Sequence, residues 1–179
     1  MRSLKEISER AIVLFSVVEA SDRENRIEIR DWLKSQNLWG AVSPNEKKLF
    51  GKAKVSEKQL INASWRVEAL EAVVWALGHL PELSPSSDQC DYDAIEDIFG
   101  FFLKDSTNFF EESKLRSTAE IQSKLDNIYD QHWKVRDAKI NNKETPNNLD
   151  AGVIREKHYA LNWMTGYENQ DWDNVSTDT

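Results

Sequence analysis

The chain has 179 residues and a formal net charge of −8. A chain of this length can bury a core of its own, so we expect residues 1–179 to form a single domain. The negative charge argues against a nucleic-acid-binding protein, which needs a basic surface, and against a protein that lies on anionic membranes. The seven tryptophans predict a dense core, because rings of this size are usually buried or used in contacts.

The N-terminal twenty residues show apolar positions at helical spacing. Glu6, Glu9 and Arg10 fill the polar face between them. This pattern predicts an amphipathic helix over 3–20 of the mature fold rather than a signal peptide. A second helix is expected over 23–36.

The sequence Ser-Pro-Asn-Glu at 43–46 is a strong helix start. It combines a capping serine, a proline at the first helical position and the glutamate of a capping box. A short helix should therefore begin here and stop near Gly51.

The stretch 56–80 is apolar almost all the way round a helical wheel, which is typical of a helix inside a domain. It has three charged residues in its middle, two of them Glu68 and Glu71, so it is a core helix rather than a membrane span. We expect one continuous helix from a capping box at its start to the residue before Pro81.

Further helices are predicted over 91–103, 106–112, 117–140 and 150–165. Asp91, Ser117 and Asp150 can cap three of them, and Gly166 can end the last one. No run of residues shows the alternation of a strand or a hairpin turn. The expected fold is all-α, an irregular bundle of about seven or eight helices around the central apolar helix 56–80.

Residues 167–179 form an acidic tail that contains Trp172. A loose tail would leave a large aromatic side chain in water, so we expect it to pack on the domain with Trp172 in a groove. The carboxylates of Asp171 and Asp173 would then reach Arg155 or Arg116.

Cys90 is the only cysteine, so no disulfide can form within the chain, which fits a reducing compartment. The acidic neighbours Asp88, Asp91 and Asp93 should raise the pKa of its thiol. We therefore expect Cys90 to be unreactive.

Seven short stretches carry a resemblance to a known family. They are SPNE at 43–46, SWRVEAL at 64–70, WALG at 75–78, LRS at 115–117, HWKVRDA at 132–138, EKHYALNW at 156–163 and DWDNVSTDT at 171–179. In this order they resemble the bacterial domain-of-unknown-function family 4272, from about residue 10 to the end. Lys134 and Lys157 depart from the pattern, in which a small residue and an arginine are more typical. The resemblance implies a bacterial, cytoplasmic protein and implies no reaction.

Motifs for phosphate loops, nucleophile elbows, zinc proteases and paired cysteines are absent from the sequence. His132 and Arg136 lie one turn apart on the apolar stripe of helix 117–140. Because a buried charge must be paired, we expect an ion pair between Arg136 and Glu68 or Glu71, with His132 hydrogen-bonded nearby. The alternative is that His132 is a general base oriented by a carboxylate.

The last helix presents Arg155, Tyr159 and Asn162 on its outer face, with His158 beside them. This face is either solvated or holds the tail; the alternative is a binding site for an anion or a partner. Asp171, Asp173 and Asp178 offer carboxylate oxygens to a hard cation. They lack the glycine and terminal glutamate of an EF-hand, and His132 and His158 have no metal-ligand spacing. We expect no metal and no cofactor.

Two functions remain open. The first is a protein that binds another protein in an accessory role, with no nucleic acid and no membrane among its partners. The second is a hydrolase that uses His132 or His158 with a carboxylate such as Glu68, with or without a metal ion. A pocket where these side chains converge would favour the hydrolase.

Overall fold

The computed structural model describes residues 1–22, 24–51, 54–100 and 105–179, and no strand occurs in these ranges. The all-α bundle predicted from the sequence is confirmed. The helices are α1 (Leu4–Asp22), α2 (Arg26–Ser35), α3 (Pro44–Leu49), α4 (Glu57–Ser64), α5 (Arg66–Ala76), α6 (Tyr92–Phe99), α7 (Thr107–Glu112), α8 (Thr118–Ile140) and α9 (Ala151–Thr165). Three 3₁₀ turns follow the last two long helices: η1 (Pro146–Asn148), η2 (Tyr167–Asn169) and η3 (Trp172–Asn174).

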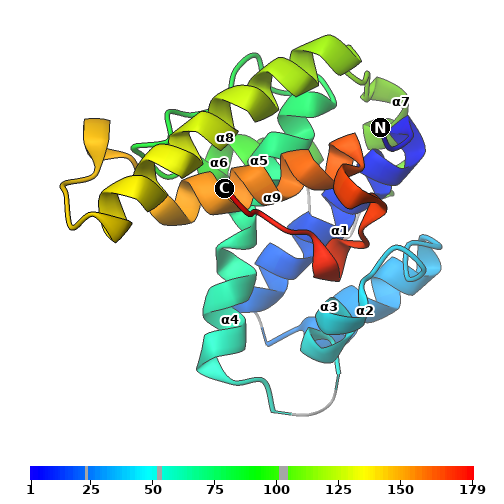
Figure 1. The fold of residues 1–179 in the computed structure, drawn as a ribbon. Coiled ribbons are helices and arrows are strands. Elements are labelled where there is room, and N and C mark those ends of the chain that lie inside the picture. The colour runs from blue at the N-terminus through cyan, green and yellow to red at the C-terminus, as the bar shows by residue number, and fades with distance from the viewer. Residues whose placement is uncertain (23, 52–53, 101–104) are drawn as a thin grey trace.

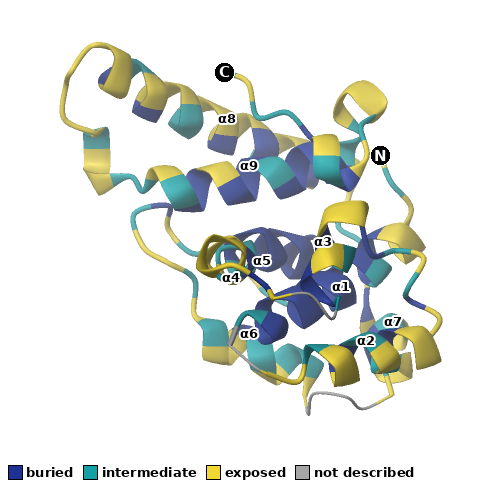
Figure 2. Cartoon of the chain, turned by 90° about the horizontal axis from the view of Figure 1, so that it is seen from below, coloured by how far each residue is buried: buried dark blue, intermediate teal, exposed yellow. Residues whose placement is uncertain are grey.

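The long helices pack in a series. Helix α9 packs on both α8 and α5, α5 packs in turn on α1, and α1 contacts α4 (Figure 1). The buried residues of α5, α1 and α9 face one another, and the exposed residues of α8 face outward (Figure 2). None of the helices in the described ranges is both long and apolar enough to cross a membrane.

The prediction of one continuous helix over 56–80 is wrong, because α4 and α5 are separate helices that meet at Trp65. The hydroxyl of Ser64 donates to the carbonyl of Ile61 over 2.9 Å, an arrangement that often bends helices. The Trp65 ring lies against Gly152 of α9. A Cβ at that glycine would come within 2.7 Å of the ring, so the close contact needs a residue without a side chain.

Of the two helices α4 and α5, only α5 therefore lies in the core. Its residues 68–76 are all buried, whereas Ala63 is the only buried residue of α4, and Ile61 beside it is exposed. Helix α5 also ends earlier than expected, at Ala76. Gly78 has a φ of +82°, and a Cβ there would meet the carbonyl oxygen of Lys114 at 3.0 Å. The left-handed glycine, not the later proline, ends this helix.

The other local helix signals are confirmed. All three predicted capping boxes form, at Ser43 with Glu46, Ser56 with Gln59, and Ser117 with Glu120. The caps at Asp91 and Asp150 and the left-handed stop at Gly166 are also present. Helix α6 ends at Phe99, and the predicted end at Leu103 lies outside the described residues.

Candidate functional site

Three charged side chains are enclosed between α5 and α9. Glu68, Glu71 and Lys157 are buried, and the lysine is 0% exposed. The Nζ atom of Lys157 lies 2.8 Å from Oε2 of Glu71 and 4.0 Å from Oε2 of Glu68, and it donates to the carbonyl of Ser84 over 2.9 Å. The predicted pairing with Arg136 is wrong: that side chain is exposed, and the cation comes from α9 instead of α8.

Backbone donors complete this cluster. The N–H of Cys90 donates to Oε1 of Glu68 over 3.0 Å, and the N–H of Ser84 donates to Oε1 of Glu71 over 2.7 Å. Burial raises the pKa of Glu68, against the opposing effect of the Cys90 N–H and Lys157. Burial also raises the pKa of the Cys90 thiol, and the two glutamates raise it further. The thiol therefore stays protonated at neutral pH. The causes are burial and the two glutamates, not the sequence neighbours Asp88, Asp91 and Asp93.

Glu68, Glu71 and Cys90 could in principle hold a metal ion, because one ligand atom from each lies within 4.8 Å of the others. The ammonium group of Lys157 already provides the positive charge at this place. We therefore describe the cluster as a buried ion pair that joins α5 to α9.

His132 of α8 and His158 of α9 are hydrogen-bonded to each other, with their Nδ1 atoms 2.9 Å apart. Nε2 of His158 lies 3.1 Å from Nδ2 of Asn162, which also donates to the carbonyl of Ser176 over 2.9 Å. A carbonyl only accepts, so this NH₂ group donates to both partners, and Nε2 of His158 accepts. His158 therefore carries its proton on Nδ1 and donates it to His132.

Both imidazoles are neutral at pH 7. Burial, and then the neighbouring His132, lowers the pKa of His158 to about 4. Burial and the charges of Arg136 and Arg155 lower the pKa of His132. In the described part of the chain, no hydrogen bond or ion pair joins either ring to a carboxylate. The Asp178 carboxylate interacts with His158 only through its charge, without a hydrogen bond that would orient the ring.

A surface groove of about 660 Å³, here called the α8–α9 groove, lies beside this pair. Its basic side chains are His132, Arg136, Lys139 and Arg155. Its apolar wall is formed by Val135, Ile140 and Ala151. No acidic residue lines it within the described ranges. Three residues that the sequence singled out as separate candidates thus meet in one basic groove.

An exposed stripe on α8 adjoins the groove. Tyr129, Trp133 and Ile140 are 45%, 50% and 70% exposed. Together with Arg136 they follow the spacing i, i+4, i+7 and i+11, which places them on one face of the helix. Tyr129 contacts the buried His158 edge to face, yet about half of its surface and that of Trp133, and most of that of Ile140, stay open to water.

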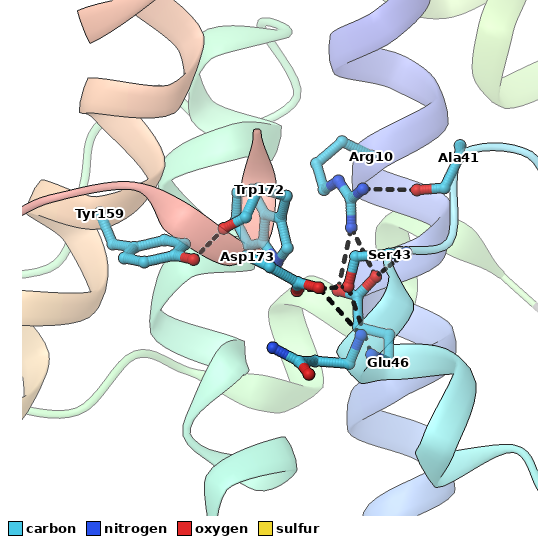
Figure 3. A network of polar contacts seen from close by, with 8 residues as sticks. Arg10, Ala41, Ser43, Glu46, Tyr159, Trp172 and Asp173 are labelled. Carbon is cyan, nitrogen blue, oxygen red and sulfur yellow. Dashed lines mark hydrogen bonds and ion pairs between the residues drawn. The ribbon is translucent and has the colours of Figure 1, made fainter. Parts of the chain in front are cut away.

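Arg10 of α1 joins α3 to the tail (Figure 3). Its Nη1 atom donates to both carboxylate oxygens of Glu46, over 2.9 and 2.8 Å, and Nη2 donates to the carbonyl of Ala41. The guanidinium carbon lies 4.7 Å from the centroid of the Trp172 ring. Arg10, which the sequence placed on the polar face of the first helix, is buried, because the paired Glu46 compensates its charge.

Trp172 anchors the tail and is 4% exposed. Its ring meets the rings of Tyr159 and Trp163 edge to face, with centroids 5.0 and 5.4 Å apart. The hydroxyl of Tyr159 donates to the carbonyl of Trp172 (Figure 3). Of the two options given for the face that carries Asn162, solvated or holding the tail, the structure shows the second: Asn162 is buried and donates to the carbonyl of Ser176 in the tail.

The tail carboxylates do not meet the arginines expected for them. Asp173 accepts from the hydroxyl of Ser43 over 2.6 Å and from a backbone N–H in the first turn of α3 over 2.9 Å. The positive end of that helix attracts the carboxylate. Arg116 donates to carbonyls at the end of α5, and Arg155 pairs with its neighbouring glutamate. Asp171 is exposed.

A cavity of about 350 Å³, here called the tail pocket, lies under the tail. It is bounded by α3, α4, α9 and η3, and its lining includes Leu49, Asn62, Arg66, Tyr159, Trp172 and Asp173. Arg66 lies 4.6 Å above the Tyr159 ring and forms a 2.8 Å ion pair with Glu156.

Sequence reasoning missed Lys157, Arg10 and Arg66 as contributors to these sites. Lys157 had a detectable signal, because it lies three residues after the buried Ile154 and four before the buried Leu161. A lysine on an apolar stripe needs a buried acid. Arg10 and Arg66 had no comparable signal, since their partners lie far away in the sequence.

A family model described as a domain of unknown function, DUF4272, matches residues 1–175 of the 179-residue chain. The chain belongs to this family. The DUF4272 assignment confirms the resemblance found in the sequence and brings no reaction or partner with it. No curated protein and no solved structure matches the chain. Several of the stretches that carry the DUF4272 resemblance, at 43–46, 64–70, 156–163 and 171–179, meet around the tail pocket.

Proposed function

We propose that this DUF4272 protein acts by binding another protein, through the α8–α9 groove and the exposed stripe of α8. The observation that carries the proposal is the exposure of Tyr129, Trp133 and Ile140 beside a basic groove. Contiguous exposed hydrophobic side chains mark interaction surfaces, and tryptophan, tyrosine and arginine are the residues that contribute most to binding energy. No other group of exposed large hydrophobic residues in the described part follows a single helix face.

The chemistry of the surface suggests an acidic partner segment with apolar side chains. The groove combines an apolar wall with the permanent charges of Arg136, Lys139 and Arg155. These cations are gathered in a chain whose net charge is −8, so they form a local positive field on an acidic protein. Such a field attracts carboxylates and repels basic partners. A second copy of the chain has the same net charge and is disfavoured for that reason.

The hydrolase alternative has less support. His132 lines a groove, as a catalytic base would. Its Nδ1 already accepts a hydrogen bond from the Nδ1–H of His158, so the proton of the neutral His132 ring lies on Nε2. A general base needs a free nitrogen and a group that orients it. The setting that we propose for the binding role is the bacterial cytoplasm, in keeping with the single cysteine of the chain.

Photo-crosslinking tests the proposal. We would place a photoreactive phenylalanine analogue at position 133 and, as a control, at position 58 on the exposed face of α4, and express both variants in the source cells. Position 133 should give a defined crosslinked protein that is absent at position 58. Equal crosslinking at both positions would contradict the proposal.

Binding measured with the captured protein then tests the surface itself. Trp133→Ala should weaken the affinity about 30-fold, as expected for a central aromatic worth roughly 2 kcal/mol. Arg136→Glu should weaken the affinity more at low salt than at high salt, because salt screens the charges of the groove. Lys58→Glu is the matched control and should change nothing. Unchanged affinity in Trp133→Ala and Arg136→Glu would refute the assignment of this surface.

A further inference from the structure

We infer that the tail pocket binds a small organic anion, with a carboxylate or phosphate group held by Arg66 and side-chain amides and an apolar part against Trp172. The inference is independent of the proposed protein contact, because the pocket lies among α3, α4, α9 and the tail, and shares no lining residue with the α8–α9 groove. Its volume of about 350 Å³ suits a small ligand.

The floor of the pocket is apolar and rigid. Val17, Leu49, Ala63 and Trp172 line it, and all four are buried. The Trp172 ring is held by its edge-to-face contacts with Tyr159 and by the overlying Arg10. A flat apolar group could therefore pack on this floor without rearrangement of the core.

The two carboxylates in the wall already accept hydrogen bonds from the protein. The carboxylate of Glu46 accepts from Arg10 and from the N–H of Ser43. The carboxylate of Asp173 accepts from the hydroxyl of Ser43 and from the N–H of Asn45. Although two acidic residues line the pocket, their oxygens are occupied within the fold (Figure 3).

The donors in the wall remain available. The side-chain oxygen of Gln59 accepts from Ser56, and that of Asn45 accepts from Lys48, so both amides keep their NH₂ groups free. Arg66 uses Nη1 in its ion pair with Glu156 and also interacts with the Tyr159 side chain, which leaves part of its five N–H donors for a ligand. A wall with oriented donors and occupied acceptors selects an oxyanion over a cation or a neutral donor.

Nuclear magnetic resonance on the ¹⁵N-labelled chain tests this inference, with benzoate and phenyl phosphate as probes and benzamide as the neutral control. Either anion, at millimolar concentration, should shift the side-chain amide signals of Asn45, Gln59 and Asn62 and the indole N–H of Trp172 in a saturable way, and benzamide should not. Comparison of the two anions shows which group the pocket prefers. The absence of saturable shifts with both anions, or equal shifts with benzamide, would overturn the inference.

Variants connect the shifts to the pocket. Arg66→Gln should reduce the affinity at least tenfold, because it removes a charge-assisted pair of donors. Asn62→Leu, on the exposed face of α4, should reduce it about threefold to tenfold without touching an ion pair, so it stays informative if Arg66→Gln does not fold. Lys58→Gln is the control on the same helix. Retained affinity in a folded Asn62→Leu or Arg66→Gln variant would place the probe elsewhere.

Discussion

Replacing Lys157 with methionine should lower the free energy of unfolding by about 3–5 kcal/mol at pH 7, because it leaves two buried carboxylates without their cation. The ammonium group lies 2.8 Å from the Glu71 carboxylate, and at an effective dielectric constant of about 20 such charges attract by roughly 6 kcal/mol. Desolvation of the ammonium offsets part of that attraction. Methionine fills a similar volume, so the substitution leaves little empty space.

Urea unfolding followed by far-ultraviolet circular dichroism measures the loss. With an m-value of roughly 2 kcal/mol per molar urea, the midpoint should fall by about 2 M. Adding Glu68→Gln and Glu71→Gln to Lys157→Met should recover most of the stability, because no uncompensated charge is then buried. Lys58→Met, at an exposed position, should stay within about 0.5 kcal/mol of the parent.

A loss of less than about 1 kcal/mol in Lys157→Met, with an unchanged m-value, is the range of an exposed pair. That result, or a triple variant no more stable than Lys157→Met alone, would mean that these side chains do not form a buried ion cluster.

Three further predictions concern α8, α9 and the tail. Arg136→Ala should change the free energy of unfolding by less than about 0.5 kcal/mol in the same assay, since the side chain is exposed; a loss of several kcal/mol would restore the buried pairing expected from the sequence. Trp172→Ala should lower the free energy of unfolding by about 3–5 kcal/mol and Trp133→Ala by less than about 1 kcal/mol, because the Trp172 ring is buried and the Trp133 ring is exposed. Equal losses would contradict the packing of the tail. The His158 imidazole should stay neutral until the pH falls to about 4 in a proton NMR titration. Because this pKa lies below the ordinary value of 6.5, the ring stabilises the fold above pH 6.5, and that contribution is lost as the pH falls through 4; a midpoint near 6.5 would show that the ring is solvated.

The helix boundaries were largely predictable because their signals are local. A capping box such as Ser117 with Glu120 needs only four consecutive residues, and the left-handed stop at Gly166 needs one. The break at Trp65 could not be predicted in the same way. It depends on the contact with Gly152, which is distant in sequence, and apolar periodicity continues across it.

The sites depend on long-range pairing, which a single sequence does not encode in a readable form. The need of Glu68 and Glu71 for a cation was predictable from the cost of burying a charge. Which cation meets them was not, because α8 and α9 both carry basic residues, and only the packing order of the helices decides for Lys157. For the same reason the sequence predicts an arginine partner for Asp173 in the tail, whereas its carboxylate accepts hydrogen bonds from Ser43 and Asn45 at the start of α3.

The buried lysine also has a consequence for the order of events during synthesis. Glu68 and Glu71 are made well before Lys157, so the growing chain carries two acids that no cation can yet neutralise in the core. Ionised carboxylates resist transfer out of water, so α5 and α1 should not close into a dry core until α9 has been made. During synthesis the unpaired glutamates would then delay the packing of α5 on α1 until α9, which carries Lys157, has left the ribosome.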